Sequence, residues 1–302
     1  MTHRATLIHN AHAAGRLRLS TTRIIELLAE AGYDAEHVPT ESEDDLANAL
    51  KDPGELVVAA GGDGTIRGVA LALAAANTNV PLALAPLGTA NNIAHTLGLT
   101  DKAETLLRGL ATPCARPFDL GLIRAPWGEA RFLEACGVGL FAEGMERYRP
   151  GEGKSLFRAS QAALETLTHY EARAWQLSLD GRDLSGRYLM LEVMNTTAMG
   201  LRLRLAPDAD PSDGMFDVVR VREDARISFQ TYVGKLVAGD LETLPNIDVV
   251  RGRRLKLAWD GLPLHFDEEV RGDDPARGPG GDLEIEVQAD ALTLWLPEHT
   301  QV

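Results

Sequence analysis

The sequence predicts an N-terminal α/β domain with an open, mostly parallel sheet, followed by a β-rich, sandwich-like C-terminal domain. The chain has 302 residues, 45% of them hydrophobic and 25% charged, which is enough for two separate cores. Up to residue 118, short apolar runs alternate with helical patterns, as in a parallel α/β sheet. Beyond that point, short alternating segments recur between Asp-Gly turns, which is typical of a sandwich. We therefore expect domains over residues 1–118 and 119–302, with the last residues packing back on the first domain.

The first domain begins as a series of strand and helix signals. Leu7-Ile8 indicates a short strand, and a helix over 24–28 follows, which Gly32 would end. Leu56–Ala60 is a compact apolar run that leads into Gly61-Gly62, as a buried parallel strand does. The other expected elements are a strand ending near Val38, helices over 43–51 and 65–76, and a strand over 81–85.

The second domain shows strand signals separated by turn signals. The turns are Asp180-Gly181, Asp213-Gly214 and Asp260-Gly261. Helices are expected over 156–169 and 227–237. The expected strands are Trp175–Leu179, Tyr188–Val193, Phe216–Val221, Leu255–Trp259, Leu283–Val287 and Leu292–Leu296.

Charge and cysteine content narrow the classes of function. The 30 Lys and Arg against 44 Asp and Glu give a net charge of −14, which argues against a nucleic-acid partner. No apolar run approaches the roughly 18 residues of a membrane span, and nothing at the N-terminus is typical of a signal peptide. Two cysteines, Cys114 and Cys136, make neither a disulfide framework nor a metal clip, so we expect a cytoplasmic protein.

A glycine-rich turn follows the buried strand at 56–60. Its residues are Gly61, Gly62, Asp63, Gly64 and Thr65, and a helix follows directly. Glycines expose backbone N–H groups, and the helix dipole adds positive potential, so the turn suits phosphates. A carboxylate beside phosphates is repulsive unless a divalent cation intervenes, so Asp63 points to Mg²⁺ and a nucleotide. The alternative is a tight turn in which the aspartate only caps the helix.

A second turn, Pro-Leu-Gly-Thr-Ala-Asn-Asn, follows the next apolar run and places Gly88, Thr89 and Asn91 before another helix. Two consecutive βα turns should converge at one edge of the sheet. The pairing of GGDGT with PLGTANN resembles the diacylglycerol kinase catalytic family, which includes bacterial lipid kinases and the sphingosine and ceramide kinases. NAD kinases and phosphofructokinases carry a related GGDG turn. The resemblance implies a fold like that of NAD kinase and diacylglycerol kinase.

The resemblance also implies the nucleotide and metal residues. The stretch from Asn10 to Gly15 is similar to the family's first-strand turn, and Thr40 matches a threonine near the nucleotide. A structural Mg²⁺ would take the Asp213 carboxylate and the carbonyls of Asp210 and Met215, and such hard oxygen ligands suit it. From the residues alone, this stretch is equally an Asp-Gly hairpin turn. The expected nucleotide residues are Asn10, Thr40, Gly61, Gly62, Asp63, Gly64, Thr65, Gly88, Thr89 and Asn91.

An acidic group at Asp267 and Glu269 stands where the family has Asp-Gly-Glu. Such a pair can bind metal or accept the proton of the acceptor hydroxyl. In an extended segment the two would face the same side and Glu268 would point away. We expect Asp267 to anchor the metal and the acceptor, while proton acceptance falls to either residue. The departures from the family are Glu268 for Gly, Asn92 where many members have Asp, and a missing glycine triplet after Asn195.

The densest basic cluster consists of Arg251, Arg253, Arg254 and Lys256. It is either a contact for anionic lipid heads or a solvated strand face.

The resemblance implies an ATP- and Mg²⁺-dependent lipid kinase, with catalytic residues Asp63, Asp267 and Glu269 and a lipid hydroxyl as acceptor. Transient peripheral contact with the inner face of the membrane fits a lipid acceptor, and a homodimer is left open. The alternatives are a NAD-kinase-like enzyme with a soluble acceptor and a nucleotide sensor that has lost catalysis.

Overall fold

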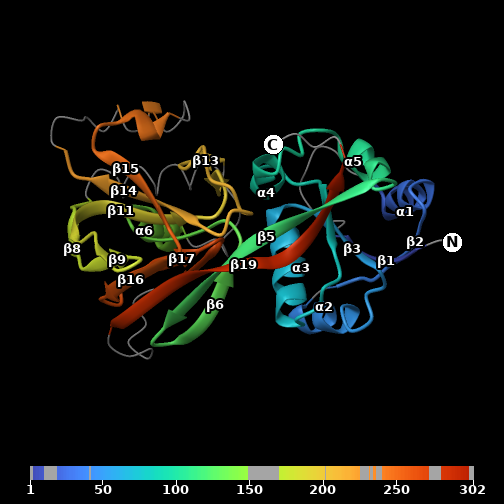
Figure 1. Ribbon diagram of the computed structural model, residues 1–302, viewed down its shortest axis with the longest axis horizontal. Helices are drawn as coiled ribbons and strands as arrows, with labels where there is room; N and C mark the ends of the chain where they lie inside the picture. Colours follow the sequence, from blue (N-terminus) through green and yellow to red (C-terminus); the bar gives the residue numbers. More distant parts are fainter. Residues whose placement is uncertain are drawn as a thin grey trace. The chain divides into compact units, whose positions relative to one another are not determined.

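The computed structural model describes residues 3–9, 19–40, 42–148, 170–200, 202–224, 231, 234–235, 240–271 and 280–298. The chain divides into two compact units (Figure 1). We call them the α/β unit, residues 1–120 and 289–302, and the sandwich unit, residues 121–288. The α/β unit therefore also takes the C-terminal segment.

The α/β unit follows the predicted alternation of strands and helices. Its elements are β1 (His3–His9), α1 (Thr21–Glu30), β2 (Tyr33–His37), α2 (Glu43–Ala49), β3 (Leu56–Gly61), α3 (Asp63–Ala75), β4 (Leu82–Pro86), α4 (Asn92–Thr96), α5 (Ala103–Gly109) and the first part of β5 (Pro113–Ala125). Gly32 follows α1 with φ of +96°, the left-handed conformation that ends helices and that glycine adopts at little cost.

The sheet of the α/β unit is parallel throughout the pairs β1–β2, β1–β3, β3–β4 and β4–β19. One face packs on α1 and α5 through a core that includes Leu7, Val58, Leu27 and Leu107. The intervening strand residues, such as Val57, are also fully buried, so both faces are covered. Because both faces are covered, β3 is apolar along its whole length rather than alternating.

The sandwich unit holds two layers of strands. One sheet runs in the order β15-β14-β11-β7-β17-β18, with β8 beside β11, and the other layer contains β10, β9, β16, β19, β5 and β6. Side chains from both layers share one core, in which the rings of Phe132 on β6 and Phe216 on β14 stack 5.6 Å apart. This packing confirms the predicted sandwich.

The bounds of the sandwich elements match most of the predicted strands. Asp180 and Gly181, both with positive φ, form the predicted two-residue turn between β9 and β10. The elements are β6 (Gly128–Phe132), β7 (Ala135–Gly139), α6 (Leu140–Tyr148), β8 (Arg173–Trp175), β9 (Leu177–Leu179), β10 (Arg182–Asp183), β11 (Gly186–Met194), β12 (Ala198–Met199), β13 (Leu203–Arg204), β14 (Phe216–Arg222), η2 (Leu241–Thr243), β15 (Ile247–Gly252), β16 (Arg254–Trp259), β17 (Leu264–Phe266), β18 (Glu269–Arg271) and β19 (Gly281–Pro297).

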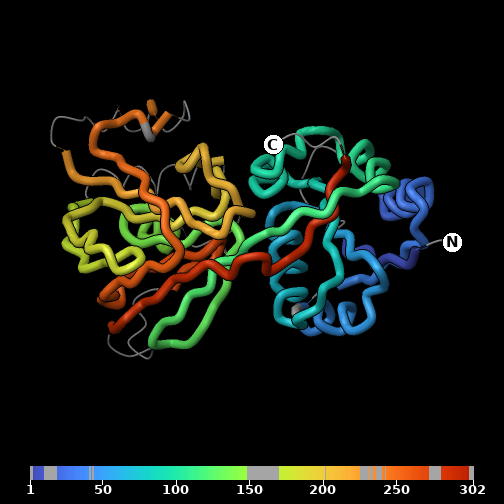
Figure 2. Tube along the Cα trace, viewed as in Figure 1, coloured from blue at the N-terminus to red at the C-terminus, as the bar shows by residue number. Residues whose placement is uncertain are grey.

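The last strand corrects a sequence prediction. The segments 283–287 and 292–296, expected as two strands, are parts of one strand, β19, which pairs with β5 (Figure 2). Asp290 takes a positive φ of 54°, and its N–H donates to the Asp119 carboxylate at 2.8 Å. This local irregularity lies between the two predicted segments and does not end the strand.

Several expectations fall outside the described residues. They are Asn10, the helix over 156–169 and most of the helix over 227–237. Among the described helices, none is both long and apolar enough to cross a membrane.

Candidate active site

The two glycine turns of the α/β unit touch each other, as the sequence predicts. The N–H of Leu87 donates to the carbonyl of Gly61 at 2.7 Å. A Cβ on Gly88 would lie 2.6 Å from the Cα of Gly62, so the backbones approach too closely for any side chain at position 88. The turns after β3 and β4 therefore form one continuous backbone surface at the carboxyl edge of the sheet.

The first turn opens onto the N-terminus of α3, a helix of 13 residues. Gly62 is the N-cap, and its carbonyl accepts the N–H groups of Thr65 and Ile66 at 3.0 and 3.1 Å. A Cβ on Gly61 would lie 2.4 Å from the Thr65 hydroxyl oxygen, so this hydroxyl sits directly over the Gly61 backbone. A helix N-terminus with a hydroxyl and a bare glycine backbone is suited to an anion.

The Asp63 carboxylate links the two turns. It is half-buried in the first turn of α3, and its Oδ1 accepts the N–H of Ile93, in α4, at 3.3 Å. Asn91 fixes the second turn: it adopts φ of +51°, and its side chain accepts from the N–H of Gly88 at 2.9 Å and donates to the carbonyl of Gly88 at 3.1 Å. The structure thus brings most of the predicted phosphate-binding residues together.

Two histidines lie at the same sheet edge, and sequence reasoning assigned them no role there. His9 ends β1 beside Ala60, and its Nδ1 is 2.9 Å from the Thr21 hydroxyl oxygen. Its ring centroid lies 6.3 Å from that of His37, the last residue of β2. Burial, and secondarily His37, lower the pKa of His9. Thr40 lies half-buried just past the end of β2. The periodicity places His9 and His37 at strand ends, which is the signal that could have found them.

In the sandwich unit, Asp267 is a structural junction. Its carboxylate accepts the backbone N–H groups of Leu133, Glu134 and Ala135 at distances from 2.8 to 3.3 Å. Its own N–H donates to the carbonyl of Ala135 at 2.8 Å. Both carboxylate oxygens are therefore engaged by backbone donors, in hydrogen bonds of the charge-assisted kind.

The expectation of an extended segment at 267–269 is wrong. Phe266 pairs with Glu269, so Asp267 and Glu268 are the two turn residues of the β17–β18 hairpin. Asp267, and not Glu268, takes the positive φ, of 51°, so the Glu that replaces the family's Gly sits where no left-handed backbone is needed. Glu269, on the returning strand, is exposed.

The stretch expected to hold a structural Mg²⁺ is compact, but its carboxylate is already engaged. Oδ1 of Asp213 accepts the N–H of Met215 at 2.9 Å, and Oδ2 is in contact with the Arg251 guanidinium. The carbonyl of Asp210 accepts the N–H of Asp213 at 3.4 Å. Residues as placed here do not fit an open cation site, because Arg251 supplies the positive charge. Among the described residues, no group of three or more His, Cys, Asp and Glu side chains is gathered as for a metal.

Asp217 shares this neighbourhood. Burial raises its pKa, the Arg251 guanidinium 3.7 Å away opposes that shift, and the charges of Asp213 and Asp208 add to it.

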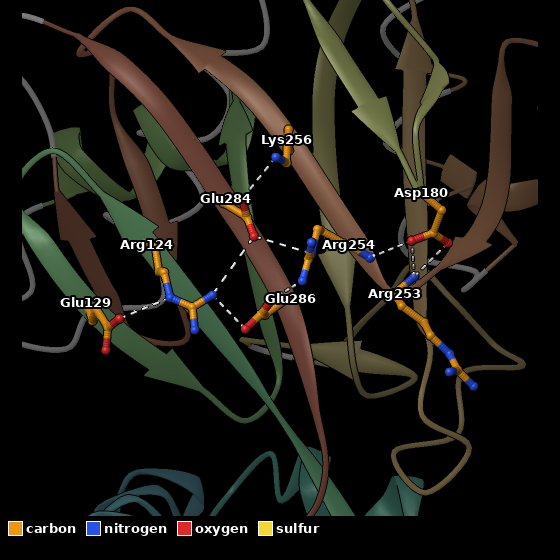
Figure 3. Close-up of polar contacts among 8 residues, drawn as sticks. All are labelled: Arg124, Glu129, Asp180, Arg253, Arg254, Lys256, Glu284 and Glu286. Carbon is orange, nitrogen blue, oxygen red and sulfur yellow. Dashed lines mark hydrogen bonds and ion pairs between the residues drawn. The ribbon is translucent and has the colours of Figure 1, made fainter.

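The basic cluster is largely neutralised within the sandwich unit (Figure 3). Arg254 lies 3.3 Å from Glu284 and 3.0 Å from Glu286, and Lys256 lies 3.3 Å from Glu284. Arg253 points away from these acids in Figure 3, and within the described part of the chain its side chain forms no ion pair. The pairing favours the interpretation of this cluster as a solvated strand face.

Comparisons with known proteins agree with this geometry. Residues 4–123 match the diacylglycerol kinase catalytic domain, and residues 145–296 match the YegS C-terminal NAD kinase beta sandwich-like domain. These two matches define a two-domain kinase that couples a glycine-turn α/β domain to a β sandwich. The chain belongs to the diacylglycerol kinase-like family.

Individual relatives cover most of the chain. A diacylglycerol kinase of Bacillus subtilis (strain 168) is 26% identical over 285 residues, covering 89% of this chain and 90% of the relative. A "Probable lipid kinase YegS-like" of Pseudomonas aeruginosa (strain UCBPP-PA14) is 32% identical over 252 residues, covering 80% and 76%. The crystal structure of a diacylglycerol kinase from Bacillus anthracis str. Sterne has the same fold, with a TM-score of 0.71, 23% identity and coverage of 97% and 96%.

Proposed function

We propose that this protein is an ATP- and Mg²⁺-dependent lipid kinase that transfers the γ-phosphoryl group to the hydroxyl of a diacylglycerol or a related lipid. The observation that carries the proposal is the contact between the two glycine turns, joined by the Asp63 carboxylate. Such a surface is unnecessary for a tight turn alone, and the family of the chain supplies the reaction class.

The α/β unit would hold the nucleotide. Backbone amides of residues 61–64 and the turn at Gly88 and Thr89 would face its phosphates, with the Thr65 hydroxyl as a further donor. Asp63 would hold the nucleotide's Mg²⁺, since a half-buried carboxylate next to a phosphate cradle suits a hard cation. When bound, this cation would neutralise charge on the transferring phosphoryl group.

The sandwich unit would supply the proton acceptor, and its geometry favours Glu269 for that role. Asp267 has both oxygens engaged by backbone N–H groups, so its carboxylate is already occupied in holding the hairpin. Glu269 is exposed on the strand that leaves the hairpin, where a hydroxyl could reach it, and the Arg271 guanidinium lies 4.0 Å from its Oε2. In this proposal Asp267 sets the position of the hairpin, and Glu269 takes the proton.

The lipid acceptor and the contact with a membrane are further parts of this proposal. Because the Arg254 and Lys256 charges are already paired, we expect any contact with anionic membranes to be weak and peripheral.

The test is transfer of labelled γ-phosphate onto a total lipid extract, with chromatographic identification of the labelled species. Diacylglycerol and NAD are supplied separately as defined acceptors. Label in a glycerolipid supports the proposal, and label only in NAD would move the protein to soluble-acceptor chemistry. Nucleotide binding without transfer to any acceptor would identify a sensor.

A further inference from the structure

A buried acid–base pair lies at the base of the β17–β18 hairpin that carries Asp267 and Glu269. Oε2 of Glu192, on β11, is 2.7 Å from Nε2 of His265, on β17, and both side chains are fully buried. The middle strand, β7, separates β11 from β17, so the pair spans two strand intervals. The proposed chemistry leaves both residues unused.

The crossing is made possible by one glycine. Gly137 on β7 pairs with Glu192 on one side and with His265 on the other. A Cβ at position 137 would lie 2.0 Å from Oε2 of Glu192 and 2.3 Å from its Cδ, so the carboxylate lies flat over the bare backbone. Any other residue at this position would expel Glu192 from its place.

Burying the Glu192–His265 pair costs free energy, so filling space in the core does not explain why the pair is there. Burial raises the pKa of Glu192, and His265 opposes that shift only in part. Among the described residues, Oε1 of Glu192 and Nδ1 of His265 have no hydrogen-bond partner. The ring of Phe141, on α6, packs edge-on against His265 with centroids 4.9 Å apart and fixes its plane. Apolar residues of similar volume would pack this position at lower cost.

The short length of strand β17 indicates what the Glu192–His265 pair contributes. It has three residues, and the hairpin turn begins immediately after Phe266. His265 stands two residues before Asp267, whose carboxylate must meet the N–H groups of residues 133–135. A second attachment at His265 would hold the base of this hairpin against β7.

We propose that Glu192 and His265 form a positioning clamp across Gly137 that holds the β17–β18 hairpin, and with it Glu269, in its working place. This inference rests on the proposed kinase function for its kinetic consequences, but the attachment itself is a property of the fold. Neither residue would touch the substrate or the nucleotide.

The test is a set of variants in the full chain, assayed with a short-chain diacylglycerol in mixed micelles and by hydrogen exchange. For Glu192→Ala we expect kcat to fall about 10-fold or more with the KM for ATP changed less than about 2-fold, the pattern of a displaced reacting group. Exchange at residues 133–135 and 267–270 should rise about 10-fold or more. Glu192→Gln, which keeps a hydrogen bond to the imidazole, should recover most of both losses.

Gly137→Ala provides the coupling test because it leaves both partners in place and removes only the space between them. It should reproduce the loss of Glu192→Ala, and the double variant should be no worse than Glu192→Ala alone. Gly252→Ala is the matched control. Gly252 lies on β15, at the other edge of the same sheet, and a Cβ there would lie 2.4 Å from Cγ of Leu179, on β9. It should lower the melting temperature and leave kcat and hairpin exchange unchanged.

Loss of stability in Glu192→Ala without change in kcat or hairpin exchange would overturn the clamp. Full additivity of the Gly137 and Glu192 substitutions would overturn it as well. If Glu192→Ala does not fold, Glu192→Gln and Gly137→Ala decide the question by the same readouts. Absence of phosphoryl transfer by the wild type would contradict the kinase proposal. Hydrogen exchange in the variants would still test the clamp.

Discussion

Asp63 in the α/β unit and Asp267 in the sandwich unit are the same side chain held in two different ways. Asp63 is half-buried in the first turn of a helix and accepts the N–H of Ile93, in the helix α4 that follows the second turn. Asp267 is the first residue of a hairpin turn and accepts three consecutive N–H groups. The comparison separates an acid that we propose meets a ligand from an acid that holds the backbone of its own unit.

The largest effect is expected at Asp63. Asp63→Asn keeps the acceptor for the Ile93 N–H but removes the charge, so the fold should survive while turnover falls by about 10²-fold or more. Steady-state kinetics and a melting curve measure the two effects. Asp45→Asn, at another helix N-terminus of the same unit, is the control and should leave turnover unchanged. Normal turnover in Asp63→Asn would leave the turn with a purely structural role.

The second prediction sets Asp267 against Glu269. Asp267→Asn places an amide donor among backbone donors, which should cost about 1–3 kcal/mol of unfolding free energy and lower turnover through misplacement. Glu269→Gln should lower turnover about 10- to 100-fold with an unchanged melting temperature, because the side chain is exposed. Kinetics paired with thermal melts distinguish them. A destabilised Glu269→Gln and a stable Asp267→Asn would reverse the assignment.

The third prediction concerns which positive charge lies beside Asp213, the Arg251 guanidinium or a bound Mg²⁺. Since the Arg251 guanidinium is in contact with this carboxylate, we expect the melting temperature to be the same with Mg²⁺ and with chelator. Arg251→Met should lower it, because Asp213 and the buried Asp217 lose their positive neighbour. Arg253→Met, two residues further along between β15 and β16 and without an ion pair within the described residues, is the control. A rise on adding Mg²⁺ to the wild type would restore a resident ion at this turn.

The smallest effect is a pH dependence at the edge of the α/β unit. Burial lowers the pKa of His9, so the unfolded chain takes up its proton at higher pH than the folded chain. Its stabilising contribution is therefore complete above about pH 6.5 and declines as the pH falls through the folded pKa. Between about pH 7.5 and pH 5.5 the melting temperature should fall less in His9→Gln than in the wild type.

Much of the α/β unit was predictable because its signals are local. Apolar runs, glycine turns and helix ends specify β3, α3 and the turn at Gly88 without reference to distant residues. The contact between the two turns followed from a general property of parallel sheets. Family resemblance then supplied the reaction class, which periodicity alone does not contain.

The sandwich unit resisted prediction where partners lie far apart in sequence. Nothing around Asp267 indicates that its carboxylate would meet the N–H groups of residues 133–135, more than a hundred positions earlier. The Glu192–His265 pair spans 73 positions and depends on a glycine in a third strand. Arg251 belongs to a basic run in sequence, but its pairing with Asp213 requires the β14–β15 register.

The path of strand β19 determines which fragments of this chain can fold alone. Its residues after Ala289 belong to the α/β unit, and Leu294 pairs with Leu82 on β4. A fragment ending at Leu120 would therefore leave β4 with a bare apolar edge, the kind of edge along which chains aggregate. A fragment meant to fold alone needs residues 289–298 joined back to it by a short linker, because the sandwich unit is an insertion between two parts of a single sheet.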